Sequence, residues 1–86
     1  MAELSRFFGI IIRMFFDDHN PPHIHVEHSG KKATFDLRGN ILQGDLRSKV
    51  ATRLVREWID LHSQELEYDW ELAQQGKPLK KIQPLE

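Results

Sequence analysis

Four of the five histidines lie within ten positions, in a segment that two adjacent prolines stiffen. The segment reads Asp17-Asp18-His19-Asn20-Pro21-Pro22-His23-Ile24-His25-Val26-Glu27-His28. Imidazole changes its charge near neutral pH and also binds divalent metal ions, so such a cluster can transfer protons or hold a metal. Three interpretations of this histidine cluster compete.

The first interpretation is a metal site. His23 and His25 are two residues apart in a predicted strand, so their side chains lie on the same face. With His19 they would give three nitrogen ligands for zinc or another divalent ion, and Asp18 and Glu27 are the alternative third ligands. The spacing by itself does not fix which of the three completes the site.

The second interpretation is metal-free catalysis by Arg13, His23 and His25. Two imidazoles match the two proton transfers of RNA phosphodiester cleavage, in which the 2′-OH is an internal nucleophile. Arg13 interrupts an otherwise apolar strand and would stabilise the developing negative charge. The sequence therefore predicts a defined partner for this guanidinium.

The third interpretation is structural, since polar side chains at turns commonly satisfy local hydrogen bonds. His19 would cap the turn, His28 would end a strand, and His23 would stack on Pro22 or Phe15. His62 stands alone in the second half of the chain and is also expected to be structural.

The elements that must position these side chains follow from hydrophobic periodicity. In the first half, β-branched and aromatic residues alternate with polar ones between Gly, Asn and Pro breaks, which predicts strands. The expected strands cover residues 9–16, 23–28, 32–38 and 41–43. Asp45 or Ser48 is the expected N-cap of the helical half that follows.

The second half changes to a helical period. Apolar residues recur at spacings of three and four, which predicts helices at about 47–62 and 64–75 with Trp58 and Trp70 in the core. Gly76 would end the second helix. The tail, residues 77–86, carries three apolar side chains and is expected to pack back on the domain.

The expected architecture is therefore α+β: an antiparallel four-stranded β-meander followed by two C-terminal helices packed on one face. At 86 residues the chain fits a single domain, with strands about 9–46, helices about 47–75 and a tail at 77–86. Ile24, Val26, Phe35 and Leu37 would meet the helices. Arg13, His23, His25, Glu27, Thr34, Asp36 and Arg38 would occupy the opposite face.

Composition narrows the chemistry. The absence of cysteine excludes a disulfide scaffold, a thiolate zinc site and a cysteine nucleophile. The net charge of −1 excludes a global basic field of the kind that attracts nucleic acid or anionic membranes. No apolar run is long enough to span a membrane and no signal-peptide pattern is visible, so we expect a cytoplasmic protein.

Charge is nevertheless segregated along the helical half. Lys49, Arg53 and Arg56 fall on one narrow helical stripe, which we call the basic strip, and the following residues are acidic. Such a strip is often only a solvated face, but it could also contact a nucleic-acid backbone or a protein partner. The sequence predicts phosphate contacts at these three residues as one of the open alternatives.

A set of segments along the chain is familiar: Ser5-Arg6-Phe7-Phe8-Gly9-Ile10, Ile12-Arg13-Met14, Asp17 to His25, Glu57-Trp58, Leu61-His62, Trp70 to Ala73 and Gly76 to Ile82. In these segments the chain resembles the bacterial DUF4160 family, a domain of unknown function. Members look like halves of two-gene cassettes similar to toxin–antitoxin modules. The resemblance therefore implies a small cognate partner protein from an adjacent gene, and it assigns no activity.

Together these observations favour a toxin–antitoxin-type component whose Arg13, His23 and His25 act on or bind RNA or another phosphodiester. The alternatives are a non-enzymatic protein-interaction module and a histidine-based divalent-metal site.

Overall fold

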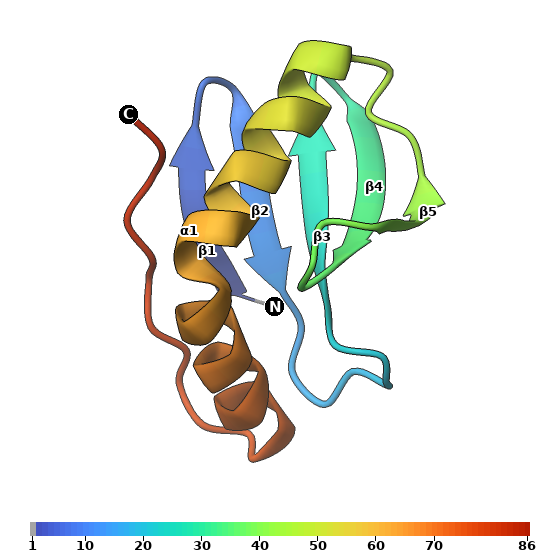
Figure 1. Cartoon of the computed structure of the whole chain (residues 1–86). Coiled ribbons are helices and arrows are strands. Elements are labelled where there is room, and N and C mark those ends of the chain that lie inside the picture. The colour runs from blue at the N-terminus through green and yellow to red at the C-terminus, as the bar shows by residue number, and fades with distance from the viewer. Residues whose placement is uncertain (1) are drawn as a thin grey trace.

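The computed structural model describes residues 2–86 and shows an antiparallel sheet followed by one long helix (Figure 1). Five strands form the sheet in the order β1-β2-β3-β4-β5, so neighbours in sequence are neighbours in space. The elements are β1 (Ala2–Phe7), β2 (Ile10–Met14), β3 (His23–His28), β4 (Lys31–Asp36), β5 (Ile41–Gly44) and α1 (Lys49–Gln74). The α+β class and the antiparallel meander are confirmed.

The prediction of four strands was wrong because it omitted β1. The register between β1 and β2 shifts between Glu3 and Ser5, so Leu4 and Ser5 are both buried and the alternation of period two is broken. Phe8 and Gly9 have φ of 49° and 76° and form the tight turn into β2. The strand expected at 9–16 is accordingly shorter, at Ile10–Met14.

The prediction of two helices was also wrong, since a single helix runs through the expected break. His62 alone has non-helical backbone angles, φ −123° and ψ 23°, and the helix resumes after it. The His62 ring packs 5.4 Å from that of Trp58, and its Nδ1 lies 2.6 Å from Glu65 Oε1. The break that the sequence predicts at residues 62–63 is therefore a kink within one helix, and buried apolar residues continue on both sides of it.

Both ends of α1 match the sequence signals. Ser48 is the N-cap and its Oγ accepts a hydrogen bond from the Ala51 backbone N–H at 3.0 Å. Gly76 has φ of 68° just beyond the C-cap Gln75. Within residues 2–86, no helical segment combines the length and the apolar character that crossing a membrane requires.

The core lies between α1 and one face of the sheet, which the helix crosses over β1 and β2 (Figure 1). As expected, Ile24, Val26 and Phe35 are buried on this face, and Trp58 and Trp70 are buried on the helix. Among residues 2–86, no helix or strand lies over the other face of the sheet (Figure 1), which we call the open face.

The tail after Gly76 packs back on the domain, as predicted. The Ile82 backbone N–H donates to the Leu4 carbonyl at 2.8 Å, and Trp58 Nε1 donates to the Gln83 carbonyl at 2.9 Å. Closer to the helix, the Lys80 backbone N–H donates to Asp69 Oδ1 at 2.9 Å. These bonds hold the tail against β1 and α1.

Asp69 gives a testable consequence of this packing. Its side chain is buried and Oδ2 has no hydrogen-bond partner. Burial raises the pKa of Asp69 above its ordinary value, with the negative charge of Glu65 adding to the effect. The stabilisation associated with the protonated carboxyl is thus fully present below the unfolded pKa and is lost as the pH rises through the folded pKa.

We therefore expect the free energy of unfolding of the wild type, relative to Asp69→Asn, to fall as the pH rises from about 4 to about 8. Chemical denaturation at several pH values measures this difference. Asp60→Asn, on an exposed part of α1, is the matched control and should show no such trend. A difference for Asp69→Asn that is constant or grows with pH would contradict this account.

Candidate functional site

The connection between β2 and β3 is anchored to the C-terminal end of α1. The Asp17 backbone N–H donates to the Ala73 carbonyl at 3.1 Å, and Gln74 Nε2 donates to the Asp18 carbonyl at 2.9 Å. The Asn20-Pro21 peptide bond within this connection is cis. Because the helix holds the backbone at Asp17 and Asp18, the Asp18 side chain is placed over the start of β3.

The Asp18 carboxylate lies between two imidazoles. Its Oδ2 is 2.7 Å from His23 Nε2 and 3.2 Å from His25 Nε2. One ligand atom from each of these residues lies within 4.8 Å of the other two. Asp18, His23 and His25 therefore form one cluster, which we call the Asp-His-His cluster.

The charge of Asp18 is stabilised by its neighbours. Burial pushes the pKa of Asp18 upward, but contacts from His25, from the His19 backbone N–H and from His23 outweigh it. Together they hold the pKa of Asp18 below its ordinary value. The carboxylate is thus an anion at neutral pH.

His23 is the buried member of the cluster, with 7% of its side chain exposed. Its Nδ1 lies 2.7 Å from the Pro21 carbonyl oxygen, while Nε2 faces Asp18. The ring of Trp70 lies 5.4 Å away and closes the side toward α1. Both ring nitrogens of His23 therefore face oxygen atoms.

His25 connects the cluster with the open face. Its ring stacks on Phe15 at 3.9 Å with an interplanar angle of 9°, and 31% of its side chain is exposed. It borders a hollow on the open face that is also lined by Arg13, Phe15, Glu27, Lys32, Thr34 and Gln43. We call this the open-face hollow.

Arg13 lies in this hollow directly opposite His25 in the β2–β3 register. Its Nη1 is 3.0 Å from Glu27 Oε1, which is the defined partner that the sequence led us to expect. Lys32 is the register partner of Glu27 on β4. The hollow thus holds two cations and one carboxylate beside the His25 ring.

The structure brings the predicted residues together only in part. Arg13 and His25 line the open-face hollow. His23 shares the side of β3 that carries His25, since both rings reach the same Asp18 oxygen, but the loop and Trp70 bury it, so it does not line the hollow. Of the expected metal ligands His19, His23 and His25, His19 has 90% of its side chain exposed and its Nδ1 faces the other Asp18 oxygen, at 3.2 Å. Asp18 takes the third place in the cluster.

The structural interpretation of single histidines also needs correction. The His19 backbone N–H donates to Asp18 Oδ1 at 3.0 Å, and the His19 ring is the more distant neighbour of that oxygen, at 3.2 Å. It is His25 that stacks on Phe15, while His23 packs near Trp70. The role of Phe15 as a platform for His25 was missed, although alternation in residues 9–16 and 23–28 assigns both side chains to the same face.

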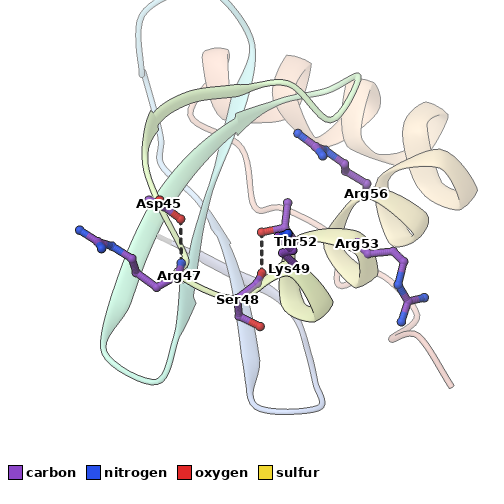
Figure 2. A pocket seen from close by; sticks show the side chains of 7 residues that line it. All are labelled: Asp45, Arg47, Ser48, Lys49, Thr52, Arg53 and Arg56. Atoms are coloured by element: carbon purple, nitrogen blue, oxygen red, sulfur yellow. Dashed lines mark hydrogen bonds between the residues drawn. The ribbon is translucent and has the colours of Figure 1, made fainter.

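The basic strip lies at the other end of α1 from the Asp-His-His cluster. Figure 2 shows a shallow hollow at the start of α1 lined by Asp45, Arg47, Ser48, Lys49, Thr52, Arg53 and Arg56. Arg56 Nε donates to the Gly39 carbonyl at 2.9 Å, so one cation of the strip is engaged within the chain. Lys49 and Arg53 are exposed, and phosphate binding there stays a prediction.

Comparison with known proteins identifies one family. The family model described as "Domain of unknown function (DUF4160)" matches residues 9–71, a range that contains Arg13 and the whole Asp-His-His cluster. A search of curated proteins found no match, and neither did a search of solved structures. The match covers well over half of the chain, and the chain therefore belongs to the DUF4160 family.

Proposed function

We propose that the protein binds and acts on a phosphodiester, RNA being the expected substrate, in the open-face hollow. The observation that carries this proposal is the direct register pairing of Arg13 with His25. Residues directly opposite on neighbouring strands have Cβ atoms about 5 Å apart. A phosphate held by the Arg13 guanidinium would thus lie beside the His25 imidazole.

The charges of the hollow support an anionic ligand. Arg13 and Lys32 supply two positive charges, and Glu27 supplies one negative charge that already orients Arg13 at 3.0 Å. A bound phosphate would restore the balance by adding negative charge between the two cations. Arg13 has 27% of its side chain exposed, so it can reach a ligand from its present position.

The chemistry assigned to His25 is proton transfer. Phe15 and Asp18 fix the plane of its ring, and a positioned imidazole can exchange a proton with the 2′-OH or the leaving oxygen of RNA. Arg13 would stabilise the charge that develops on the phosphate. His23 is buried against Pro21 and Asp18, so we assign it the positioning of Asp18 and not contact with substrate.

We place this activity in a toxin–antitoxin-type module of the bacterial cytoplasm. Support comes from the resemblance of DUF4160 members to halves of two-gene cassettes. The exposed cations Lys49 and Arg53 would give an RNA backbone a second contact, away from the hollow.

Incubation of the purified protein with single-stranded and hairpin RNA tests the proposal. We expect the wild type to cleave RNA. His25→Ala should lower the cleavage rate by at least about 100-fold, because positioned acid–base groups contribute on that scale. Arg13→Ala should weaken RNA binding and slow cleavage together. His28→Ala is the matched control, since His28 ends the same strand but lies outside both the cluster and the hollow.

Equal cleavage by the wild type, His25→Ala and Arg13→Ala would indicate a contaminating nuclease and contradict the proposal. Failure of the wild type to bind or cleave any of these RNAs would contradict it as well.

A protein-interaction module is the second candidate, and the outward side of α1 favours it. Val50, Leu61 and Tyr68 are 59%, 67% and 51% exposed. Val50 and Leu61, eleven residues apart, return to one side of the helix, and Tyr68 follows the kink at His62. Large apolar residues exposed at such spacing can pack against the apolar side of a partner helix. We assign this helix to the small partner protein encoded by the adjacent gene.

Co-expression with that gene product, followed by size-exclusion chromatography, tests this second function. We expect a complex for the wild type and an affinity at least about tenfold lower for Leu61→Glu, because a buried carboxylate opposes helix packing. Gln43→Glu, which adds the same charge on the open face of the sheet, away from α1, should leave the complex intact. A wild type that stays monomeric in the presence of the partner would exclude the interaction.

A further inference from the structure

We propose that Asp18, His23 and His25 bind a divalent metal ion of the zinc class. The inference goes beyond the proposed function, because ion binding at this cluster requires no phosphodiester.

The Pro21 carbonyl determines which nitrogen of His23 carries hydrogen. A carbonyl oxygen can only accept, so Nδ1, at 2.7 Å from it, must be the N–H donor. In a neutral ring, Nε2 then presents a lone pair, and this atom lies 2.7 Å from the anionic Oδ2 of Asp18. A lone pair and a carboxylate oxygen stay this close only when a cation, either a proton or a metal ion, lies between them.

His25 brings a second nitrogen to the same Asp18 oxygen. Its Nε2 points to the same Asp18 oxygen at 3.2 Å, so two nitrogens and one oxygen converge on one position. In a tetrahedral zinc site with bonds of about 2.05 Å, neighbouring ligand atoms are about 3.3 Å apart. The two nitrogen–oxygen distances would need to open by about 0.6 Å and about 0.1 Å, and the two nitrogens, which lie within 4.8 Å of one another, would need to sit about 3.3 Å apart.

Each of the three ligand side chains is also fixed by a contact that does not involve the ion. His23 donates Nδ1–H to the Pro21 carbonyl, an outer contact that metal-binding histidines commonly make. Asp18 Oδ1 accepts from the His19 backbone N–H, which leaves Oδ2 for the ion. The His25 ring is fixed by its stacking on Phe15.

The donor set indicates the class of ion. Two imidazole nitrogens with one carboxylate oxygen suit Zn²⁺, Co²⁺ or Fe²⁺, whereas Mg²⁺ and Ca²⁺ prefer oxygen ligands throughout. Three protein ligands leave a position for water. The cluster is most exposed at His25, at 31%, so that position would open toward the hollow that contains Arg13.

Titration of metal-free protein with Zn²⁺ alone tests the inference. The protein is purified without nickel resin, stripped with a chelator and followed by calorimetry, and Co²⁺ is added in a parallel experiment read by its visible absorption. We expect the wild type to bind one ion per chain. Asp18→Asn and His25→Ala should each lower the affinity for the ion by at least about 100-fold. His28→Ala and His19→Ala should bind as the wild type does.

Binding by the wild type that survives both Asp18→Asn and His25→Ala would overturn the inference, as would the absence of binding. Loss of binding in His19→Ala alone would show that the ligand set is wrong. Asp18→Asn could disturb the loop, so a second measurement follows the melting temperature. Zn²⁺ should raise the melting temperature of the wild type and of His28→Ala, but not that of His25→Ala.

The outcome separates this inference from the proposed function. Stoichiometric Zn²⁺ binding by a protein that neither binds nor cleaves RNA supports the metal site and rejects the phosphodiester function. Cleavage of RNA by protein that binds no Zn²⁺ rejects the metal site and supports that function.

Discussion

The Asp18 carboxylate between His23 and His25 is the contact around which the candidate site is built. It exists because the end of α1 holds the β2–β3 connection through Ala73 and Gln74. These two bonds tie the loop backbone to the last turn of the helix, while His23 holds it to β3 through the Pro21 carbonyl. The helix therefore does more than cover the sheet, since its last turn also sets the position of a charged side chain.

The same contact joins two different environments. His23 is enclosed by the loop and by Trp70, whereas His25 stacks on Phe15 at the border of a hollow with two cations. Asp18 Oδ2 thus connects the buried His23 ring with the His25 ring, which a ligand can reach. The other nitrogen of His23 is fixed by the Pro21 carbonyl. Any ion bound at Asp18 would belong to both environments.

Much of this arrangement could be predicted from the sequence, because it depends on local periodicity. Alternation in residues 23–28 places His23 and His25 on one face, and an arginine within an apolar strand calls for a partner, which is Glu27. The Ser48 cap and the Gly76 stop follow from local preferences as well. β1 was missed because its bulge at Glu3 to Ser5 hides the alternation.

What could not be predicted depends on contacts between distant residues. Gln74 and Asp18 are 56 positions apart, and the bond between them holds the loop in which Asp18, not His19, completes the cluster. The burial of His23 likewise needs Trp70 from α1, so strand alternation alone assigned it to the wrong environment. Local patterns indicated which residues have the chemistry, and tertiary contacts decided which of them meet.

The central claim is that His23 Nε2, His25 Nε2 and Asp18 Oδ2 together bind a divalent metal ion. Nitrogen-15 NMR of the histidine rings during addition of Zn²⁺ tests it most directly. The account predicts that Nε2 of both His23 and His25 shifts to a metal-bound value while Nδ1 of His23 keeps its proton. Unchanged His23 and His25 signals, with shifts confined to His19 or His28, would contradict it.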